Sequence, residues 1–238
     1  MANPAGSTSG VTSQTLSRGL RILEVLAARG TAASSSEISA ELGLHRSIAY
    51  RLLRTLEEHR LVVRDERGFF ELGPRLAALA ATVERDLQQA AVPALRSAAD
   101  DLGATCFLVR HDGGEAITLT SALPRRSIVT VAQHPGTQHP LGIGAPGRAV
   151  LCQLPREQWP EGLNEQQRTD TATAAAEGFA ESRDEVIPGL RSVAVPLVLS
   201  GSVPLAVAVA FLVSERSPRE IAERLQVVAE EISAALDA

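Results

Sequence analysis

Lysine is absent from this chain, cysteine occurs twice, and aromatic residues make up only 3% of its 238 residues. Two cysteines cannot form the framework of disulfides that holds small secreted domains together. Cys106 and Cys152 each lie within an apolar run, where a thiol usually packs as a small hydrophobic group. We therefore expect neither a disulfide scaffold nor a zinc site.

Long apolar runs are also missing. The longest stretches, 193–199 and 203–213, adjoin or contain Pro196 and Pro204, and neither reaches the ~18 residues of a membrane-spanning helix. The N-terminal residues show no basic segment followed by an apolar one, so they do not resemble an export signal. The length and a hydrophobic content of 45% suit one small and one medium domain. We expect a soluble, cytoplasmic protein that does not bind membranes.

The net charge of −5 is unevenly distributed along the chain. Residues 1–76 hold ten arginines against eight acidic residues, whereas the remainder holds thirteen arginines against twenty acidic residues. Because nucleic-acid binding depends on local fields more than on total charge, an acidic protein can still carry a basic DNA-binding region. The excess of positive charge lies at the N-terminal end.

Three helices are predicted in this N-terminal part. Apolar residues recur at helical spacing from Leu16 and stop at Gly30. Ser34 and Glu37 have the spacing of a capping box, which opens a short helix over 37–42 before Gly43. A third helix is predicted over 45–58. Its two opposite stripes are apolar (Ile48, Leu52, Leu56) and polar (Arg46, Tyr50, Arg54).

A β-hairpin is predicted directly after these helices. Residues 61–64 and 69–72 flank the polar turn 65–68, and Arg67 at its tip is placed to enter a minor groove. The capping box, the short helix, the turn with Gly43, the helix with a basic face and the hairpin occur in the order of a winged helix-turn-helix. That motif places its recognition helix in the major groove of DNA.

The candidate DNA-binding residues lie on the predicted recognition helix, at helix starts or at the hairpin tip: Ser35, Ser36, His45, Arg46, Ser47, Tyr50, Arg51, Arg54 and Arg67. Arginine makes bidentate contacts to guanine, and Ser47 and Tyr50 can bond phosphates or base edges. Arg51 and Arg54 suit the flanking backbone. Two alternatives stay open: arginines that only solvate a surface helix, with Arg54 paired to Glu58, and Tyr50 packed against the wing.

The rest of the chain mixes helices and strands. Residues 73–90 form a predicted linker helix, and Pro93 restarts a second helix that ends near Gly103. Strands are predicted at 105–110, 115–120, 127–133, 192–199 and 203–213, and an amphipathic helix at 217–236. The polar segment 161–176 is expected to be a surface helix or loop. Because no regular alternation of strands and helices appears, we expect an α+β domain around an antiparallel sheet.

A resemblance to the helix-turn-helix and wing of IclR-type bacterial transcriptional regulators is carried by SSSEISAELGLHRSIAYRLLRTLEEHRLVVRDERGFFELGPRL. Residues 139–149 are similar to the family's PLHxTAxGKA segment, 178–185 to GYAxDxEE and 189–197 to GVxCIAAPV, so the resemblance covers residues 12–236. It implies a flexible tail at 1–11, a winged helix-turn-helix at 12–72 and a linker helix at 73–90. An effector-binding and oligomerisation domain with a GAF/profilin-like sheet would occupy 91–238.

The resemblance also implies partners. Members of the family bind palindromic operator DNA as homodimers, often paired into homotetramers, and respond to a small-molecule effector. On that basis we expect a ligand-responsive transcriptional regulator that needs no cofactor, with repression favoured over activation.

By the same resemblance, the effector pocket would be lined by Ala145, Pro146, Ser182, Ser192, Val209 and Phe211. Ser182 stands where the family has aspartate, Ser192 where it has cysteine, and Gly142 where it usually has histidine. Val209 and Phe211 would make the pocket more apolar, which disfavours a small keto acid and favours a larger, partly apolar ligand. The alternative is that both are ordinary inward residues of a buried strand.

Two other functions stay open. The larger domain could be an enzyme, yet His111, His134 and His139 have no Cys, Asp or Glu at ligand spacing beside them. The pair Asp184-Glu185 is predicted to lie on a charged helix face and not to act as general acid and base. Alternatively, the larger domain only oligomerises and senses nothing. We expect no catalytic residues and no metal site.

Overall fold

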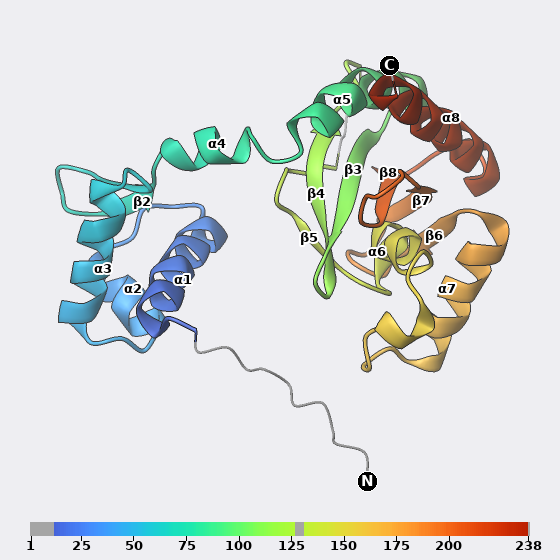
Figure 1. Cartoon of the computed structure of the whole chain (residues 1–238). Coiled ribbons are helices and arrows are strands. Elements are labelled where there is room, and N and C mark those ends of the chain that lie inside the picture. Colours follow the sequence, from blue (N-terminus) through green and yellow to red (C-terminus); the bar gives the residue numbers. More distant parts are fainter. Residues whose placement is uncertain (1–11, 127–130, 238) are drawn as a thin grey trace, which may run out of the picture. The chain divides into compact units, whose positions relative to one another are not determined.

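A computed structural model describes residues 12–126 and 131–237 of the chain (Figure 1). The chain divides into two compact units, Met1–Val83 and Glu84–Ala238, and the division falls inside the predicted linker 73–90. The expected tail at 1–11 and the first part of the strand expected at 127–133 lie outside the described residues. Each unit is described by itself below.

The first unit contains the predicted winged helix-turn-helix. Its elements are α1 (Gln14–Arg29), α2 (Ser35–Glu41), α3 (Arg46–Glu58), β1 (Val62–Arg64), β2 (Phe70–Leu72) and α4 (Arg75–Ala80). Ser34 and Glu37 form the predicted capping box at the start of α2, and Gly30 ends α1 in the left-handed conformation. β1 and β2 pair antiparallel. Ile22, Ile38 and Phe70 belong to the small core that joins these elements.

The stripe of buried residues on α3 is not quite the predicted stripe. At two of its three positions the buried residue is the next one along the chain. Ala49, Leu53 and Leu56 are buried, whereas Ile48 and Leu52 are only half-buried. Ile48 and Leu52 instead line a groove toward α1. The amphipathic pattern is broad enough to fit either stripe, so packing against α1 and α2 decides which one faces the core.

The predicted linker helix is not continuous. α4 ends at Ala80, residues 81–84 form a turn, and α5 runs over Arg85–Leu102 with Pro93 inside it. Pro93 is exposed, so the chain loses one backbone hydrogen bond there without distorting the packed face of α5, which buries Ala94 and Leu95. Glu84 adopts a φ of 47° at the turn. The break between the two helices therefore lies before α5, and the prediction of a break at Pro93 is wrong.

The second unit is built on one six-stranded antiparallel sheet in the order β5-β4-β3-β8-β7-β6. The strands are β3 (Thr105–Asp112), β4 (Glu115–Ala122), β5 (Gln138–Pro140), β6 (Ala180–Arg183), β7 (Arg191–Leu197) and β8 (Leu205–Phe211). The helices are α5, α6 (Gly144–Leu151), α7 (Glu165–Glu177) and α8 (Pro218–Leu236), with a short 3-10 turn at Arg156–Gln158. This arrangement confirms the α+β prediction.

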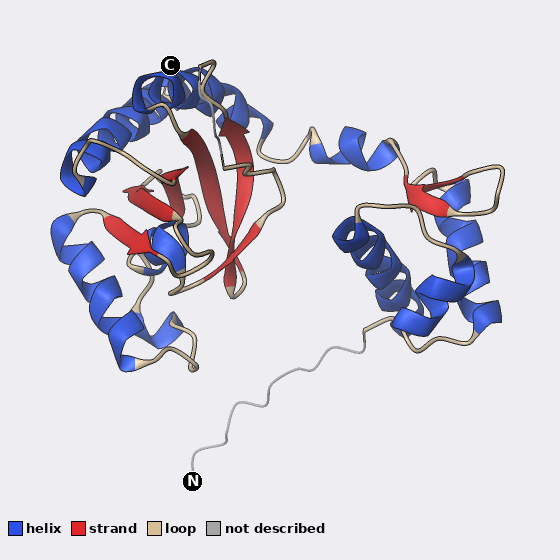
Figure 2. Cartoon of the chain, turned by 180° about the vertical axis from the view of Figure 1, so that it is seen from behind, coloured by secondary structure: helices blue, strands red, loops and turns tan. Residues whose placement is uncertain are grey.

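Helices cover both faces of the sheet (Figure 2). One face packs against α5 and α8 and carries the larger side chains of the central strands, among them Val193, Val207 and Val209. The other face packs against α6 and carries small side chains, among them Ala194, Ala208 and Ala210. Side chains of a strand alternate between faces, so the two cores share the same strands.

Several elements of the second unit were not predicted. β5, α6 and β6 had no separate prediction, and the expected helix or loop at 161–176 is largely helix α7. Asp184 and Glu185 follow strand β6 in a turn, so the predicted charged helix face is wrong. Asp184 has a φ of 60°, and its carboxylate accepts a hydrogen bond from the backbone N–H of Gly189 at 2.6 Å.

Candidate DNA-binding surface and effector cavity

The turn between α2 and α3 has the geometry of a helix-turn-helix. Gly43 adopts a φ of 62°, where glycine avoids the strain of a Cβ atom, and the N–H of Leu44 donates to the carbonyl of Ser39 at 2.8 Å. His45 then starts α3: its Nδ1 accepts from the backbone N–H of Ser47 at 3.4 Å and lies 2.8 Å from the Ser47 hydroxyl. These contacts fix the direction of α3.

Most predicted DNA-binding residues are exposed. The exposed ones are Ser36, His45, Arg46, Ser47, Tyr50, Arg51, Arg54 and Arg67, and Ser35 is half-buried. Tyr50 is 44% exposed on α3. Arg54 pairs with Glu57 at 2.9 Å, so the alternative pairing with Glu58 is wrong. For Arg46 and Arg51 the described part of the chain provides no salt bridge.

Arg67 lies at the hairpin turn between β1 and β2. Its side chain is 80% exposed, its Nε lies 3.4 Å from a carboxylate oxygen of Asp65, and its guanidinium lies 5.5 Å from the ring centre of Phe69. An exposed pair of this kind contributes little to stability, so Arg67 can exchange it for a phosphate or a groove contact at small cost.

A groove between α1 and α3 adds residues that sequence reasoning missed. It encloses about 410 Å³ and is lined by Thr15 and Arg18 from α1 and by Arg51 and Thr55 from α3, with Ile48 and Leu52 at its base. Two guanidinium groups and two hydroxyl groups around one groove can bind a phosphate. The signal in the sequence was the spacing of three between Thr15 and Arg18, which puts both on one helix face.

In the second unit, the predicted effector-binding residues of α6, β6 and β7 are in contact with one another. The backbone N–H of Ala145, in the first turn of α6, donates to the Ser182 hydroxyl at 3.1 Å and to the Ser192 hydroxyl at 3.3 Å. The two hydroxyl oxygens lie 2.7 Å apart, because Ser182 and Ser192 are direct partners across β6 and β7. Pro146 is buried in the same turn and offers no N–H.

A buried arginine lies one turn further along α6. Arg148 is 3% exposed and donates through Nη1 to the carbonyl of Glu181 at 2.6 Å and through Nη2 to the Glu185 carboxylate. The same Nη2 lies 3.6 Å from the carboxylate of Asp170 on α7. Among the described residues, Nε of Arg148 has no hydrogen-bond partner. Sequence reasoning missed this cluster, since its members are far apart in the chain.

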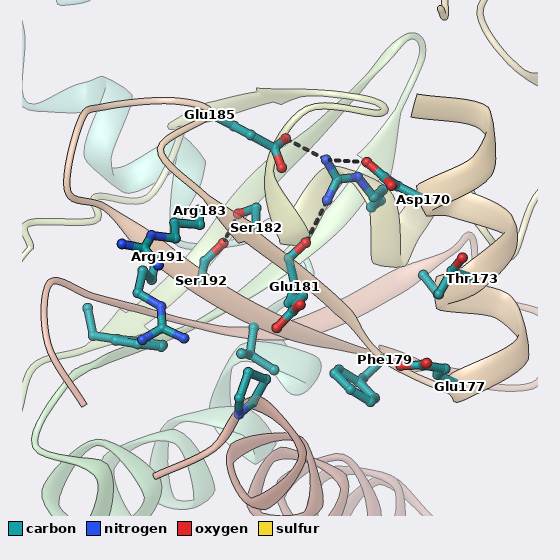
Figure 3. A pocket seen from close by; sticks show the side chains of 15 residues that line it. Asp170, Thr173, Glu177, Phe179, Glu181, Ser182, Arg183, Glu185, Arg191 and Ser192 are labelled. Carbon is teal, nitrogen blue, oxygen red and sulfur yellow. Dashed lines mark hydrogen bonds and ion pairs between the residues drawn. The ribbon is translucent and has the colours of Figure 1, made fainter. Parts of the chain in front are cut away.

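A cavity of about 540 Å³ opens beside these groups (Figure 3). It is lined by Arg148, Ser182, Glu185 and Ser192, by residues of α7, and by the apolar side chains of Phe179, Val193 and Phe211. In Figure 3, Ser182 and Ser192 point toward each other, and Glu185 and Asp170 approach one guanidinium group from two sides. The volume of this cavity lies within the range of small-molecule sites, roughly 300–1,000 Å³.

Val209 and Phe211 do not share the sheet face of Ser192. Ser192 pairs with Ala210, and Val209 and Phe211 belong to the core against α5 and α8. Val209 is fully buried and does not line the cavity, so its predicted place in an apolar effector pocket is wrong. Phe211 borders the cavity while its ring lies 5.4 Å from the Arg191 guanidinium carbon. On the face of Ser192, β8 carries Ala208 and Ala210.

The histidines and cysteines show no metal-binding arrangement. Among the described residues, no three His, Cys, Asp or Glu side chains are grouped to hold an ion. His139 stacks on Phe107, and its Nε2 lies 3.1 Å from the Thr118 hydroxyl and 2.8 Å from the Gln133 amide nitrogen. Burial lowers the pKa of His139. Burial raises the pKa of Cys106 to about 12, so that thiol is unreactive at neutral pH.

Comparison with known sequences decides the family. Residues 15–66 match the IclR helix-turn-helix domain, and residues 79–234 match the C-terminal domain of the bacterial transcriptional regulator IclR. The chain belongs to the IclR family. Within the described residues of this IclR-family chain, no helix has the length and apolar character needed to cross a bilayer.

Curated relatives of this IclR-family chain are regulators. The HTH-type transcriptional regulator Rv1719 of Mycobacterium tuberculosis is 31% identical over 73% of this chain and 66% of its own length. TtgV of Pseudomonas putida, an HTH-type transcriptional regulator, is 29% identical over 68% of this chain and 61% of its own length. The HTH-type transcriptional repressor AllR of Klebsiella pneumoniae is 27% identical over 91% and 86%. The matches to the first two span just under two thirds of those relatives.

Solved IclR structures share the fold. An IclR transcriptional regulator from Alicyclobacillus acidocaldarius superposes with a TM-score of 0.82 and 25% identity, covering 94% of this chain and 99% of the other. An IclR homologue from Microbacterium hydrocarbonoxydans, solved in complex with 4-hydroxybenzoate, superposes with a TM-score of 0.81 at 22% identity over 94% and 99%. These likenesses support the two-unit architecture described above.

Proposed function

We propose that this chain is a DNA-binding transcriptional regulator whose affinity for an operator changes when a small molecule binds its second unit. The observation that carries the proposal is the exposed arginine face of α3, fixed by the turn at Gly43 and the cap at His45, in a chain of the IclR family. Arg46 would read a base edge, and Arg51, with Arg18 across the groove, would bind phosphate. A regulator that binds genomic DNA would act in the cytoplasm, where the DNA lies.

The second unit supplies the ligand-dependent part of the proposal. Its cavity brings together the first turn of α6, the hydroxyl pair of Ser182 and Ser192 and the buried Arg148. A molecule that binds there with different affinity in two arrangements of a homodimer would shift the balance between them. Half-sites of a palindromic operator then fit better or worse. Repression is the favoured outcome, because curated relatives include repressors.

One experiment tests both parts. Genomic fragments are captured with the purified chain, the enriched fragment is identified, and its binding is titrated with salt, with and without a small-molecule extract of cells. A palindromic fragment bound more tightly than random DNA, with an affinity that changes with the extract, is the expected result. The double variant R46A/R51A serves as the negative control.

Two other results would change the proposal, and a further measurement gives the oligomeric state. Equal affinity for enriched and random DNA at moderate salt would contradict sequence-specific binding of an operator. The alternative that the second unit is an enzyme would then be open again. Operator binding that no extract changes would leave the second unit a purely oligomerising domain. Sedimentation velocity, with and without the fragment, measures whether the chain is a dimer or a tetramer.

A further inference from the structure

The effector position that the family resemblance indicates, between α6 and the sheet, is closed in this chain. Ala145 is fully buried, and its backbone N–H donates to the hydroxyls of Ser182 and Ser192. Ala208 and Ala210, on the sheet face that packs against α6 (the α6 face), are buried as well. None of these three alanines belongs to the lining of the cavity. The space for a ligand therefore lies elsewhere around the edge strand β6.

The cavity extends onto the sheet face that packs against α5 and α8 (the α8 face). Side chains alternate along a strand, so Glu181 and Arg183 point away from Ser182, and Figure 3 shows Glu181 and Ser182 on opposite sides of β6. Across the pairing with β7, Val193 lies opposite Glu181 and Arg191 opposite Arg183. These four side chains line the cavity on the α8 face together with Phe179, Phe211 and Pro218.

Charges of both signs line this cavity, and some of them compensate one another. The charged lining residues are Arg148, Arg183, Arg191, Asp170, Glu177, Glu181 and Glu185. Arg148 already faces the carboxylates of Glu185 and Asp170. Nε of Arg183 lies 3.2 Å from the carboxylate of Asp184, which follows it in the chain. These two arginines therefore have their counter-charges within the chain.

Three charged groups of the lining have no ion pair among the described residues: Arg191 on β7, Glu181 on β6 and Glu177 at the end of α7. Arg191 is half-buried and lies directly opposite Arg183, where like charges repel each other. Glu181 is its diagonal neighbour across the two strands, roughly 7–8 Å away, yet the Arg191 guanidinium lies over the ring of Phe211. One uncompensated positive charge and two negative charges thus lie around one cavity, apart from each other.

An apolar floor lies beside these unpaired charges. It consists of Val193, Phe179 and Phe211, whose side chains are all buried. The Arg219 guanidinium of α8 lies 5.6 Å from the ring centre of Phe179, as Arg191 does over Phe211. A small apolar group can lie on this floor, where it gains contact with two aromatic rings.

We propose that the cavity binds a small zwitterion with an apolar side chain, the chemistry of a free apolar amino acid, on the α8 face of the sheet. Its carboxylate pairs with Arg191 and its ammonium group with Glu181, while its side chain lies on the apolar floor. A ligand with only one of the two charges leaves either Arg191 or Glu181 without a counter-charge. This inference rests on the proposed role of the second unit in binding an effector, and it names the face and the chemical class.

The test compares three probes of nearly the same shape: L-phenylalanine, 3-phenylpropanoate, which lacks the ammonium group, and 2-phenylethylamine, which lacks the carboxylate. Each is titrated calorimetrically into the full chain without DNA, with L-leucine as a second apolar amino acid. We expect saturable binding of the amino acids and affinities about tenfold or more weaker for the other two probes, the loss typical of one hydrogen-bonded charge. Equal affinity for 3-phenylpropanoate or 2-phenylethylamine overturns the proposal, and so does a failure of both amino acids to bind.

Two variants assign the charges. Arg191→Gln and Glu181→Gln should each weaken L-phenylalanine binding about tenfold or more, because each removes the counter-charge of one ligand group. The controls Arg96→Gln and Glu161→Gln make the same changes in net charge at exposed positions outside the lining, and should bind as the wild type does. A folded Arg191→Gln or Glu181→Gln protein with wild-type affinity overturns the assignment.

Methyl NMR of the wild type determines the face, and it needs no variant to fold. We expect nuclear Overhauser effects from the ring protons of bound L-phenylalanine to the Val193 methyl groups and none to those of Ala208 and Ala210. Contacts to the two alanines instead would place the ligand on the α6 face and overturn the proposal. Binding that leaves operator affinity unchanged would contradict the effector role of the second unit and not the site itself, so the two failures are distinguishable.

Discussion

Replacing Arg46 with alanine separates base reading from general attraction to DNA. Arg46 is the first residue of α3 and is exposed, and no ion pair holds it within the described residues. Substitutions at such positions change the free energy of unfolding by less than about 0.5 kcal/mol, so any loss of binding reflects contacts to DNA. A bidentate contact to guanine contributes about 1–3 kcal/mol, which corresponds to roughly a 5- to 150-fold loss of operator affinity per half-site.

Arg51 and Arg54 provide the comparison. Arg51 lines the groove shared with Arg18, where a phosphate contact is expected, so Arg51→Ala should weaken operator and random DNA alike. Loss of one phosphate contact should also reduce the slope of log affinity against log salt by about one. Arg54→Ala should have a smaller effect, because the Arg54 guanidinium is already compensated by Glu57 at 2.9 Å.

Fluorescence anisotropy on the operator fragment and on a scrambled fragment of equal composition, at several salt concentrations, measures all three effects. Circular dichroism and melting temperatures confirm that each variant is folded. If Arg46→Ala loses the same factor on both fragments and shows the reduced salt slope, Arg46 binds phosphate and the assignment of base reading to it is refuted.

Three further predictions concern the packing and pH dependence of the fold. Gly147→Ala puts a Cβ against the Pro140 carbonyl and should cost about 1–3 kcal/mol in melting experiments, whereas Gly162→Ala, with open space around it, should be nearly neutral. Ser34→Ala removes the capping box of α2 and should lower the free energy of unfolding by about 0.5–2 kcal/mol in denaturant titrations. Burial lowers the pKa of His139, so its stabilising contribution is complete above the unfolded pKa of about 6.5 and is lost as the pH falls toward the folded value. Melting temperatures measured between pH 7.5 and 5.5 should fall with the pH, and this fall should be smaller in His139→Gln. A fall of the same size in His139→Gln and in the wild type would contradict the assignment of this pH dependence to His139.

The N-terminal unit could be predicted closely because its signals are local. The capping box at Ser34, the glycines at the ends of α1 and α2, and the hairpin turn each act within a few residues. Helix α6 could not be predicted in the same way, since Gly144, Pro146 and Gly147 are poor helix formers. Every residue of α6 is buried, so tertiary packing and not local propensity stabilises this helix.

The candidate effector cavity shows which feature of the fold a single sequence does not reveal. Every residue of β8 is apolar and buried, so the usual alternation of apolar and polar residues, which tells one face of a strand from the other, is absent. A shift of one position therefore put Val209 and Phe211 where Ala208 and Ala210 lie. Side-chain size was the remaining signal that could distinguish the two faces of β8. Its large side chains face α5 and α8, whereas its alanines face α6.

That difference in size also explains the chemistry of the cavity. Alanines at 194, 208 and 210 form a flat sheet face, and Gly147 leaves no side chain between α6 and the backbone at Pro140. With so little bulk between them, α6 and the sheet come close enough for the Ala145 N–H to reach the hydroxyls of Ser182 and Ser192. A larger residue at 210, the direct partner of Ser192, would move the first turn of α6 away from both hydroxyls. Packing on one face of the sheet thus determines which polar groups line the cavity.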